Sequence, residues 1–120
     1  MDNNAFVQSV FNAVDRADAQ GLADFMTDNA VFRFSNFPEV VGKENITPFL
    51  ENFFQSIKGI KHDQLEYWEI PGGYVINGRV TYTRHDGSIY PCWFANTFKM
   101  ENGKIKDYLI FVDNSKLYSN

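Results

Sequence analysis

The sequence predicts one α+β domain, in which N-terminal helices pack over the concave face of a curved antiparallel or mixed sheet. The predicted shape is a cone that encloses a pocket. Apolar residues follow helical spacing up to Ile57, and from His62 onward the pattern changes to strands. Helices followed by an antiparallel meander are typical of α+β folds. Aromatic residues make up 17% of the chain, with 12 Phe, and so many large rings need a core or a lined cavity.

The chain begins with two predicted helices. Apolar residues recur at helical spacing over Phe6–Ala17 and predict the first helix. Asp18 is expected to cap a second, shorter helix, because a carboxylate accepts hydrogen bonds from the free N–H groups at a helix start. The predicted buried face of this helix consists of Leu22, Phe25 and Met26.

A strand and a third helix follow. The segment Ala30–Phe34 predicts a strand, and the strongest helical stripe in the chain runs over Ile46–Ile57. Thr47 and Pro48 are a good cap and first-turn pair, since proline lacks the N–H that the first turn of a helix leaves unpaired. A start at Lys43, with a kink at Pro48, is the alternative.

The second half of the chain predicts four strands, over Lys61–Ile70, Tyr74–Arg84, Tyr90–Met100 and Lys104–Asp113. Hairpin turns containing Gly separate them, and Asp-Gly and Asn-Gly tolerate the positive φ that tight turns need. Asn77-Gly78 lies inside a long strand pattern. We interpret it as a bulge, because strands bend sharply at glycine.

Composition excludes several classes of partner. The formal net charge is −4 and no Lys/Arg cluster is present, which argues against nucleic acid and anionic membranes. The single cysteine, Cys92, cannot form an internal disulfide. Without a signal-peptide pattern or an apolar run of roughly 18 residues, the chain is expected to be one cytoplasmic domain over residues 1–120.

The order of elements and a set of short motifs resemble the nuclear-transport-factor-2-like superfamily and its SnoaL-like polyketide cyclases. The motifs are Asp18 before a short helix, Asp28-Asn29-Ala30-Val31-Phe32, Gly42, Gly73–Tyr82, Asn102-Gly103-Lys104-Ile105, and Asp113 at the end of the last strand. They cover nearly the whole chain and are specific for the fold. The family contains cyclases, isomerases, dehydratases, epoxide hydrolases and non-catalytic adaptors, so the resemblance implies a fold and not a reaction.

The resemblance disfavours epoxide hydrolysis. Members similar to limonene epoxide hydrolase carry an Arg and an Asp two residues apart on one strand and a second Asp on the last strand. Arg79 matches that Arg, but Thr81 and Ile110 stand at the two Asp positions. The water-holding Tyr and Asn of that group correspond to Phe32 and Phe34, so four of these five polar positions are lost.

A mechanism like that of ketosteroid isomerase is disfavoured too. Such members carry a general-base carboxylate on the early strand, and proton abstraction beside a carbonyl needs a positioned base. Here that strand reads Phe32, Arg33 and Phe34, without a carboxylate.

Arg79 is the first catalytic candidate. It alternates along its strand with Val80 and Tyr82, so it faces the cavity if those two face outward. There its guanidinium could bind a carboxylate or an enolate oxygen. The alternative is an arginine paired with an acid at the rim.

His62 and Asp113 are the acid/base candidates. His62 can titrate near neutral pH, and the alternative is a surface histidine at a strand end. Asp113 could be a carboxylate at the pocket mouth, although its parity disagrees if Ile110 and Val112 point inward. The alternative for Asp113 is a cap of a short final helix over Asn114–Leu117.

The predicted ligand-binding residues are Phe32, Phe34, Phe53, Thr81, Phe94, Tyr108 and Ile110. Two histidines and one cysteine without close spacing predict no metal site, and no phosphate-binding loop or other cofactor motif is present.

Three functions remain open. The first is a cofactor-independent cyclase, isomerase or lyase acting on a hydrophobic carbonyl compound. The second is a binding module for a small hydrophobic ligand. The third is an interaction domain that forms a homodimer through the outer face of the sheet, because residues such as Val80, Tyr82 and Phe111, or their register partners, are expected to make that face apolar. Trp68 and Trp93 fit either a ligand or a dimer interface.

Overall fold

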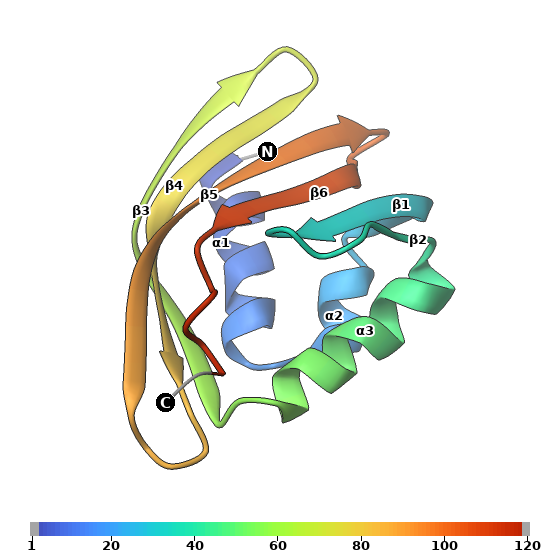
Figure 1. Ribbon diagram of the computed structural model, residues 1–120. Coiled ribbons are helices and arrows are strands. Elements are labelled where there is room, and N and C mark those ends of the chain that lie inside the picture. Colours follow the sequence, from blue (N-terminus) through green and yellow to red (C-terminus); the bar gives the residue numbers. More distant parts are fainter. Residues whose placement is uncertain (1–2, 119–120) are drawn as a thin grey trace.

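The computed structural model describes residues 3–118 and confirms the α+β class (Figure 1). The ends of the predicted domain, residues 1–2 and 119–120, lie outside the described residues. The elements are α1 (Asn3–Asp15), α2 (Ala19–Ala23), β1 (Met26–Phe34), β2 (Val40–Val41), α3 (Lys43–Gln55), β3 (Gly59–Ile70), β4 (Gly73–Thr83), β5 (Ile89–Glu101) and β6 (Lys104–Val112).

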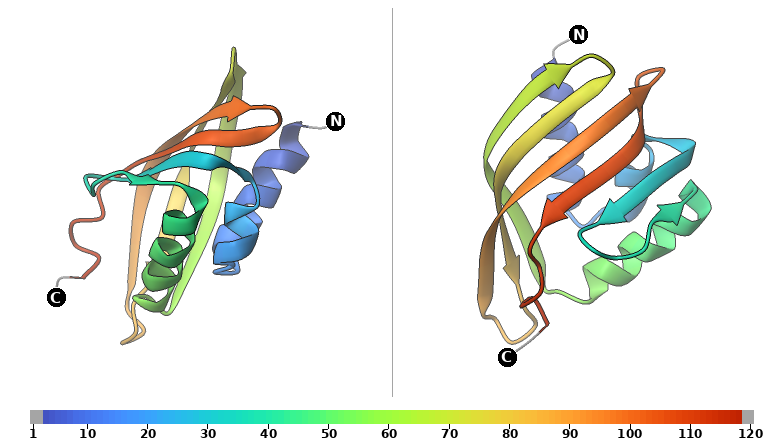
Figure 2. Two further views of the ribbon diagram at one scale, coloured as in Figure 1. Left: turned by 90° about the vertical axis from the view of Figure 1, so that its right-hand side faces the viewer. Right: turned by 45° about the horizontal axis from the view of Figure 1, so that its top comes forward.

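The six strands form one open, mixed sheet in the order β2-β1-β6-β5-β4-β3. Strands β1 and β6 pair in parallel, and the remaining neighbours pair antiparallel. The long strands curve around the three helices, which lie on the concave side of the sheet (Figures 1 and 2). The inner face of the sheet and the helices therefore enclose the core.

The predicted cap of α2 is confirmed. Asp18 Oδ1 accepts a hydrogen bond from the backbone N–H of Gly21 at 2.9 Å, as expected for a carboxylate at a helix start. The first helix ends at Asp15 rather than at Ala17, because Ala17 adopts a positive φ of 56° that no α-helix contains. Met26, expected on the face of α2, instead begins β1.

The third helix begins at Lys43, so the prediction that Thr47 and Pro48 start it is wrong, and the alternative start at Lys43 is confirmed. Gly42 is the N-cap, with a φ of 90° that favours glycine. Its carbonyl accepts hydrogen bonds from the N–H groups of Asn45 and Ile46 at 3.0 and 2.9 Å. This capped start places Pro48 inside the helix.

The predicted bulge lies on the neighbouring strand. Strand β4 pairs with β5 without a break through Gly78, and the irregularity falls in β3, between Asp63 and Glu66. Gly78 faces that bulge closely. A Cβ atom added there would lie 2.8 Å from Leu65 Cδ2 and 2.8 Å from Phe94 Cε1, so the glycine provides space for the neighbouring side chains instead of bending its own strand.

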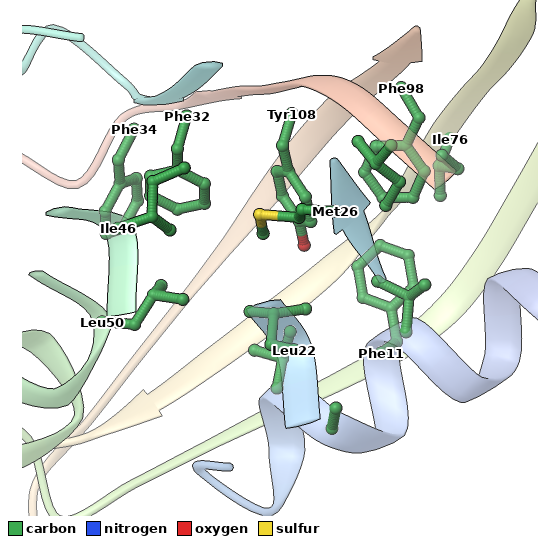
Figure 3. Packing of buried hydrophobic residues seen from close by; sticks show 14 of the residues in the cluster. Phe11, Leu22, Met26, Phe32, Phe34, Ile46, Leu50, Ile76, Phe98 and Tyr108 are labelled. Atoms are coloured by element: carbon green, nitrogen blue, oxygen red, sulfur yellow. The ribbon is translucent and has the colours of Figure 1, made fainter. Parts of the chain in front are cut away.

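The core fills the space between the sheet and the helices. Figure 3 shows Phe11 of α1 and Leu22 of α2 opposite Phe98 and Tyr108 of the sheet, with the Tyr108 hydroxyl pointing toward Leu22. All four side chains are at most 2% exposed. None of the helices in residues 3–118 is long and apolar enough to cross a membrane.

Candidate functional site

A small cavity of about 40 Å³ lies between the inner face of the sheet and the helices. Its walls come from all three helices and from five of the strands, and most of the lining side chains are apolar. Four lining side chains carry polar groups: His62, Tyr82, Asn96 and Tyr108. An apolar cavity with a few polar groups is the usual form of a small-molecule site.

The structure brings seven of the predicted site residues to this cavity. They are His62, Phe32, Phe34, Phe53, Phe94, Tyr108 and Ile110. Their contact with a ligand stays a prediction, but their common location is now established.

Arg79 and Thr81 lie on the other face of the sheet, so their predicted place in the cavity is wrong. Along β4 the buried residues are Val80 and Tyr82, and Arg79 and Thr81 alternate with them on the outer face. The Arg79 guanidinium lies 5.8 Å from the centre of the Trp93 ring, its outward neighbour on β5. The reason is strand parity, because the inner face takes the bulky apolar pair.

Asp113 is exposed beyond the end of β6 and is not among the cavity residues. Its Oδ1 accepts hydrogen bonds from the Ser115 hydroxyl at 2.6 Å and the Ser115 N–H at 3.1 Å. These bonds hold the pKa of Asp113 below its usual value. The following residues form a turn and no helix, closed by a 3.0 Å bond from Leu117 N–H to the Asn114 carbonyl. Asp113 thus shapes a surface turn and lines an open hollow beside Val112, a residue that also lines the cavity. The predicted helix after it is not found in the described residues.

The most organised polar group in the cavity is a pair formed by His62 and Asp15. His62 Nδ1 lies 2.7 Å from Asp15 Oδ1, and the backbone N–H of His62 donates to Asp15 Oδ2 at 3.1 Å. A carboxylate only accepts hydrogen bonds, so Nδ1 carries the hydrogen. Nε2 is then the ring nitrogen available to a ligand in the cavity.

Packing holds this imidazole in place. The His62 side chain is 9% exposed, and its ring packs against Phe11 and Phe94 at centroid distances of 4.9 and 5.1 Å. The position of Asp15 on the first helix already indicates that its side chain faces inward, and this signal was missed. Asp15 continues the buried spacing of Val7 and Phe11 on α1, so a carboxylate stands where the helical pattern places an inward residue.

Asn96 is the second polar group that sequence reasoning missed. It points inward from β5, is 2% exposed, and its Oδ1 has no hydrogen-bond partner. Its neighbours on the same face of the strand are Phe94 and Phe98. Across the strands it is paired with Ile76 and Ile110, so the amide is surrounded by apolar side chains.

The two tyrosines in the cavity are neutral. Burial raises the pKa of Tyr82 far above its ordinary value. Burial, and then the charge of Asp15, do the same for the pKa of Tyr108. Both hydroxyls therefore keep their protons at physiological pH and can donate hydrogen bonds.

Comparison with known proteins supplies the family. Residues 7–108 match the SnoaL-like domain. The chain belongs to this family. No curated protein matches the sequence. Membership of the family is therefore shown by the domain match, and the solved structures show the fold.

Three solved structures share the fold of this chain. A candidate polyketide cyclase from Xanthomonas campestris pv. campestris has a TM-score of 0.86 at 14% identity, with coverage of 95% of this chain and 92% of that chain. An NTF2-like protein of unknown function from Burkholderia pseudomallei has a TM-score of 0.85 at 18% identity, with coverage of 98% of this chain and 95% of that chain. TerC, co-crystallised with polyporic acid, has a TM-score of 0.82 at 16% identity, with coverage of 93% of this chain and 92% of that chain. The identities are low, and the similarity establishes the fold alone.

Proposed function

We propose that this SnoaL-like protein is a cofactor-independent enzyme that moves a proton on a small hydrophobic carbonyl compound, in a cyclisation, isomerisation or lyase reaction. The observation that carries the proposal is His62, held by Asp15 at the wall of an apolar cavity. Structural similarity to a candidate polyketide cyclase and to a protein crystallised with polyporic acid agrees with this class of reaction.

His62 and the two tyrosines have roles in this reaction. Nε2 of His62 takes the proton from the carbon beside the carbonyl, and Asp15 holds the ring in the required tautomer. The carbonyl oxygen gains negative charge as the proton leaves, and the neutral hydroxyl of Tyr108 or Tyr82 donates a hydrogen bond to it. In this reaction a tyrosine hydroxyl takes the oxyanion-binding role predicted for Arg79, and His62 rather than Asp113 moves the proton.

Ligand entry requires movement of side chains. The cavity volume of about 40 Å³ is well below the roughly 300–1,000 Å³ of typical ligand sites. Phe53 and Phe54 of α3 line the cavity and are only half-buried, so they are the side chains we expect to move when a ligand enters.

The test is exchange of α-protons in D₂O, with cyclohexanone and 1-indanone as probes and loss of the α-proton NMR signals as the readout. The proposal predicts exchange faster than in buffer alone, with saturation as the ketone concentration rises. Chemical-shift changes in the protein without any exchange would refute the enzyme and favour the alternative, a binding module that uses the same cavity.

We also propose a homodimer through the outer face of the sheet. Val80 and Tyr82 face the core and do not contribute to it, but Trp68, Trp93 and Phe111 are 51%, 66% and 49% exposed. Trp93 and Phe111 point outward from β5 and β6. Aromatic side chains are enriched in protein interfaces, which supports a second copy as the partner.

Light scattering is expected to give twice the mass of one chain, and Trp93→Glu is expected to give a monomer because it places a charge in the apolar interface. Val41→Glu is the matched control, since Val41 is 53% exposed on the short edge strand β2. A monomeric mass of the wild-type protein at working concentration would rule out the dimer.

A further inference from the structure

Among the residues that the structure describes, Asn96 has a buried amide oxygen without a hydrogen-bond partner. Its Oδ1 is inaccessible to bulk solvent and accepts no hydrogen bond, although the side chain lines the cavity. Leaving a buried acceptor unpaired costs about 1–3 kcal/mol. Every lateral neighbour of Asn96 on the inner face is apolar, and an aliphatic side chain of the same size would fit there without that cost.

The remaining polar atoms of the cavity indicate which group would complete Asn96. Asn96 Oδ1 can only accept a hydrogen bond. In the neutral ring, with the hydrogen on Nδ1 facing Asp15, Nε2 of His62 is also an acceptor. The cavity also contains two hydroxyl donors, Tyr82 and Tyr108, but neither donates to Asn96 Oδ1. The guanidinium of Arg79 cannot do so either, because it lies on the outer face. This arrangement favours a ligand that brings its own hydrogen-bond donor.

We propose that Asn96 is a specificity-determining residue that accepts a hydrogen bond from a hydroxyl group of the ligand, so that the ligand is a hydroxylated apolar molecule, a phenol or an enol. This inference deepens the proposed function and rests on the same cavity. An enol hydroxyl is the protonated form of the enolate that proton abstraction at His62 produces, so one acceptor on the wall recognises the enol form of a carbonyl substrate.

Binding of phenol and anisole tests this inference. The two molecules differ in that anisole carries a methyl group in place of the hydroxyl proton and cannot donate. NMR titration is expected to give wild-type protein a preference for phenol of about tenfold, the size of one hydrogen bond to a buried acceptor. Asn96→Leu keeps the branching and the number of side-chain heavy atoms but removes the acceptor, together with the NH₂ group of the amide. It is expected to abolish the preference.

Asn29→Leu is the matched control, because Asn29 lies on β1 with an exposed side chain. It is expected to keep the preference for phenol. The inference is overturned if wild-type protein fails to bind phenol, if it binds phenol and anisole equally, or if Asn96→Leu keeps the preference.

Thermal unfolding separates a ligand site from a structural water site. If Oδ1 is unpaired until a ligand arrives, Asn96→Leu removes the cost of burying it and raises the Tm by about 3 °C or more. If a water molecule bound in the cavity pairs with Oδ1, the same substitution breaks that network and lowers the Tm, which would overturn the inference.

Failure of this inference and failure of the enzyme proposal have different signatures. Phenol binding needs no turnover, so a preference that depends on Asn96 stands even if no α-proton exchange occurs. Exchange that depends on His62 but shows no preference for a hydroxyl group would retain the enzyme and overturn the role of Asn96.

Discussion

His62→Gln is expected to slow the α-proton exchange of cyclohexanone by about 10²–10⁴-fold, the usual contribution of one general acid or base. Glutamine retains a polar amide of similar length but cannot take a proton. The His62 ring is fixed by Asp15 and by contacts with Phe11 and Phe94. The other histidine of the chain, His85, is not among the residues that line the cavity. The rate of exchange measured by NMR in D₂O is the readout.

His85→Gln is the matched control for this experiment. His85 is exposed in the turn before β5, where its Nε2 lies 2.8 Å from the Gln55 carbonyl oxygen. The same substitution there is expected to leave the exchange rate unchanged. If His62→Gln stays folded by circular dichroism and exchanges as fast as wild type, His62 is not the base.

Asp15→Asn tests the orientation of the imidazole. The amide has the shape of the carboxylate, but it lacks the charge that stabilises a protonated ring. We expect a loss of exchange rate smaller than that of His62→Gln and clearly larger than that of His85→Gln. A rate equal to wild type in folded protein would mean that Asp15 only ties α1 to β3.

The free energy of unfolding is expected to fall steeply above pH 10. Burial raises the pKa of Tyr82 and of Tyr108 in the native protein, whereas in the unfolded chain both titrate near their ordinary value of about 10. Above that pH the unfolded chain binds fewer protons than the native protein, so stability decreases as pH rises. Each tyrosine contributes a slope of about 1.4 kcal/mol per pH unit, and together they contribute about 2.7.

Urea unfolding between pH 9 and pH 11 measures this slope. Tyr108→Phe is expected to reduce the slope by about 1.4 kcal/mol per pH unit, since phenylalanine keeps the ring and has no titrating hydroxyl. Tyr118→Phe, at a position that is 59% exposed, is the control and should leave the slope as it is. A free energy of unfolding that stays constant across this range would contradict the burial of the two hydroxyls.

Local patterns were sufficient to predict the architecture. The apolar spacing of α1 and α3, the carboxylate of Asp18, and the Gly-containing turns between the long strands all act over a few residues. Each could therefore be interpreted without knowing what lies across the molecule. At Pro48 and at Gly78 the local pattern allowed two interpretations. There the glycine cap at Gly42 and the bulge on β3 decided the outcome.

The site depended on contacts that no local pattern contains. Alternation along β4 shows that Val80 and Tyr82 lie on one face of the sheet and Arg79 on the opposite face. Both faces carry large apolar residues, so the alternation alone did not show which face is inside. The pair of Asp15 and His62 joins residues 47 positions apart. Thus the sequence by itself determined the fold and the aromatic character of its core. Only the tertiary structure decided which polar groups meet inside, because a one-residue change in strand parity exchanges every inward side chain for an outward one.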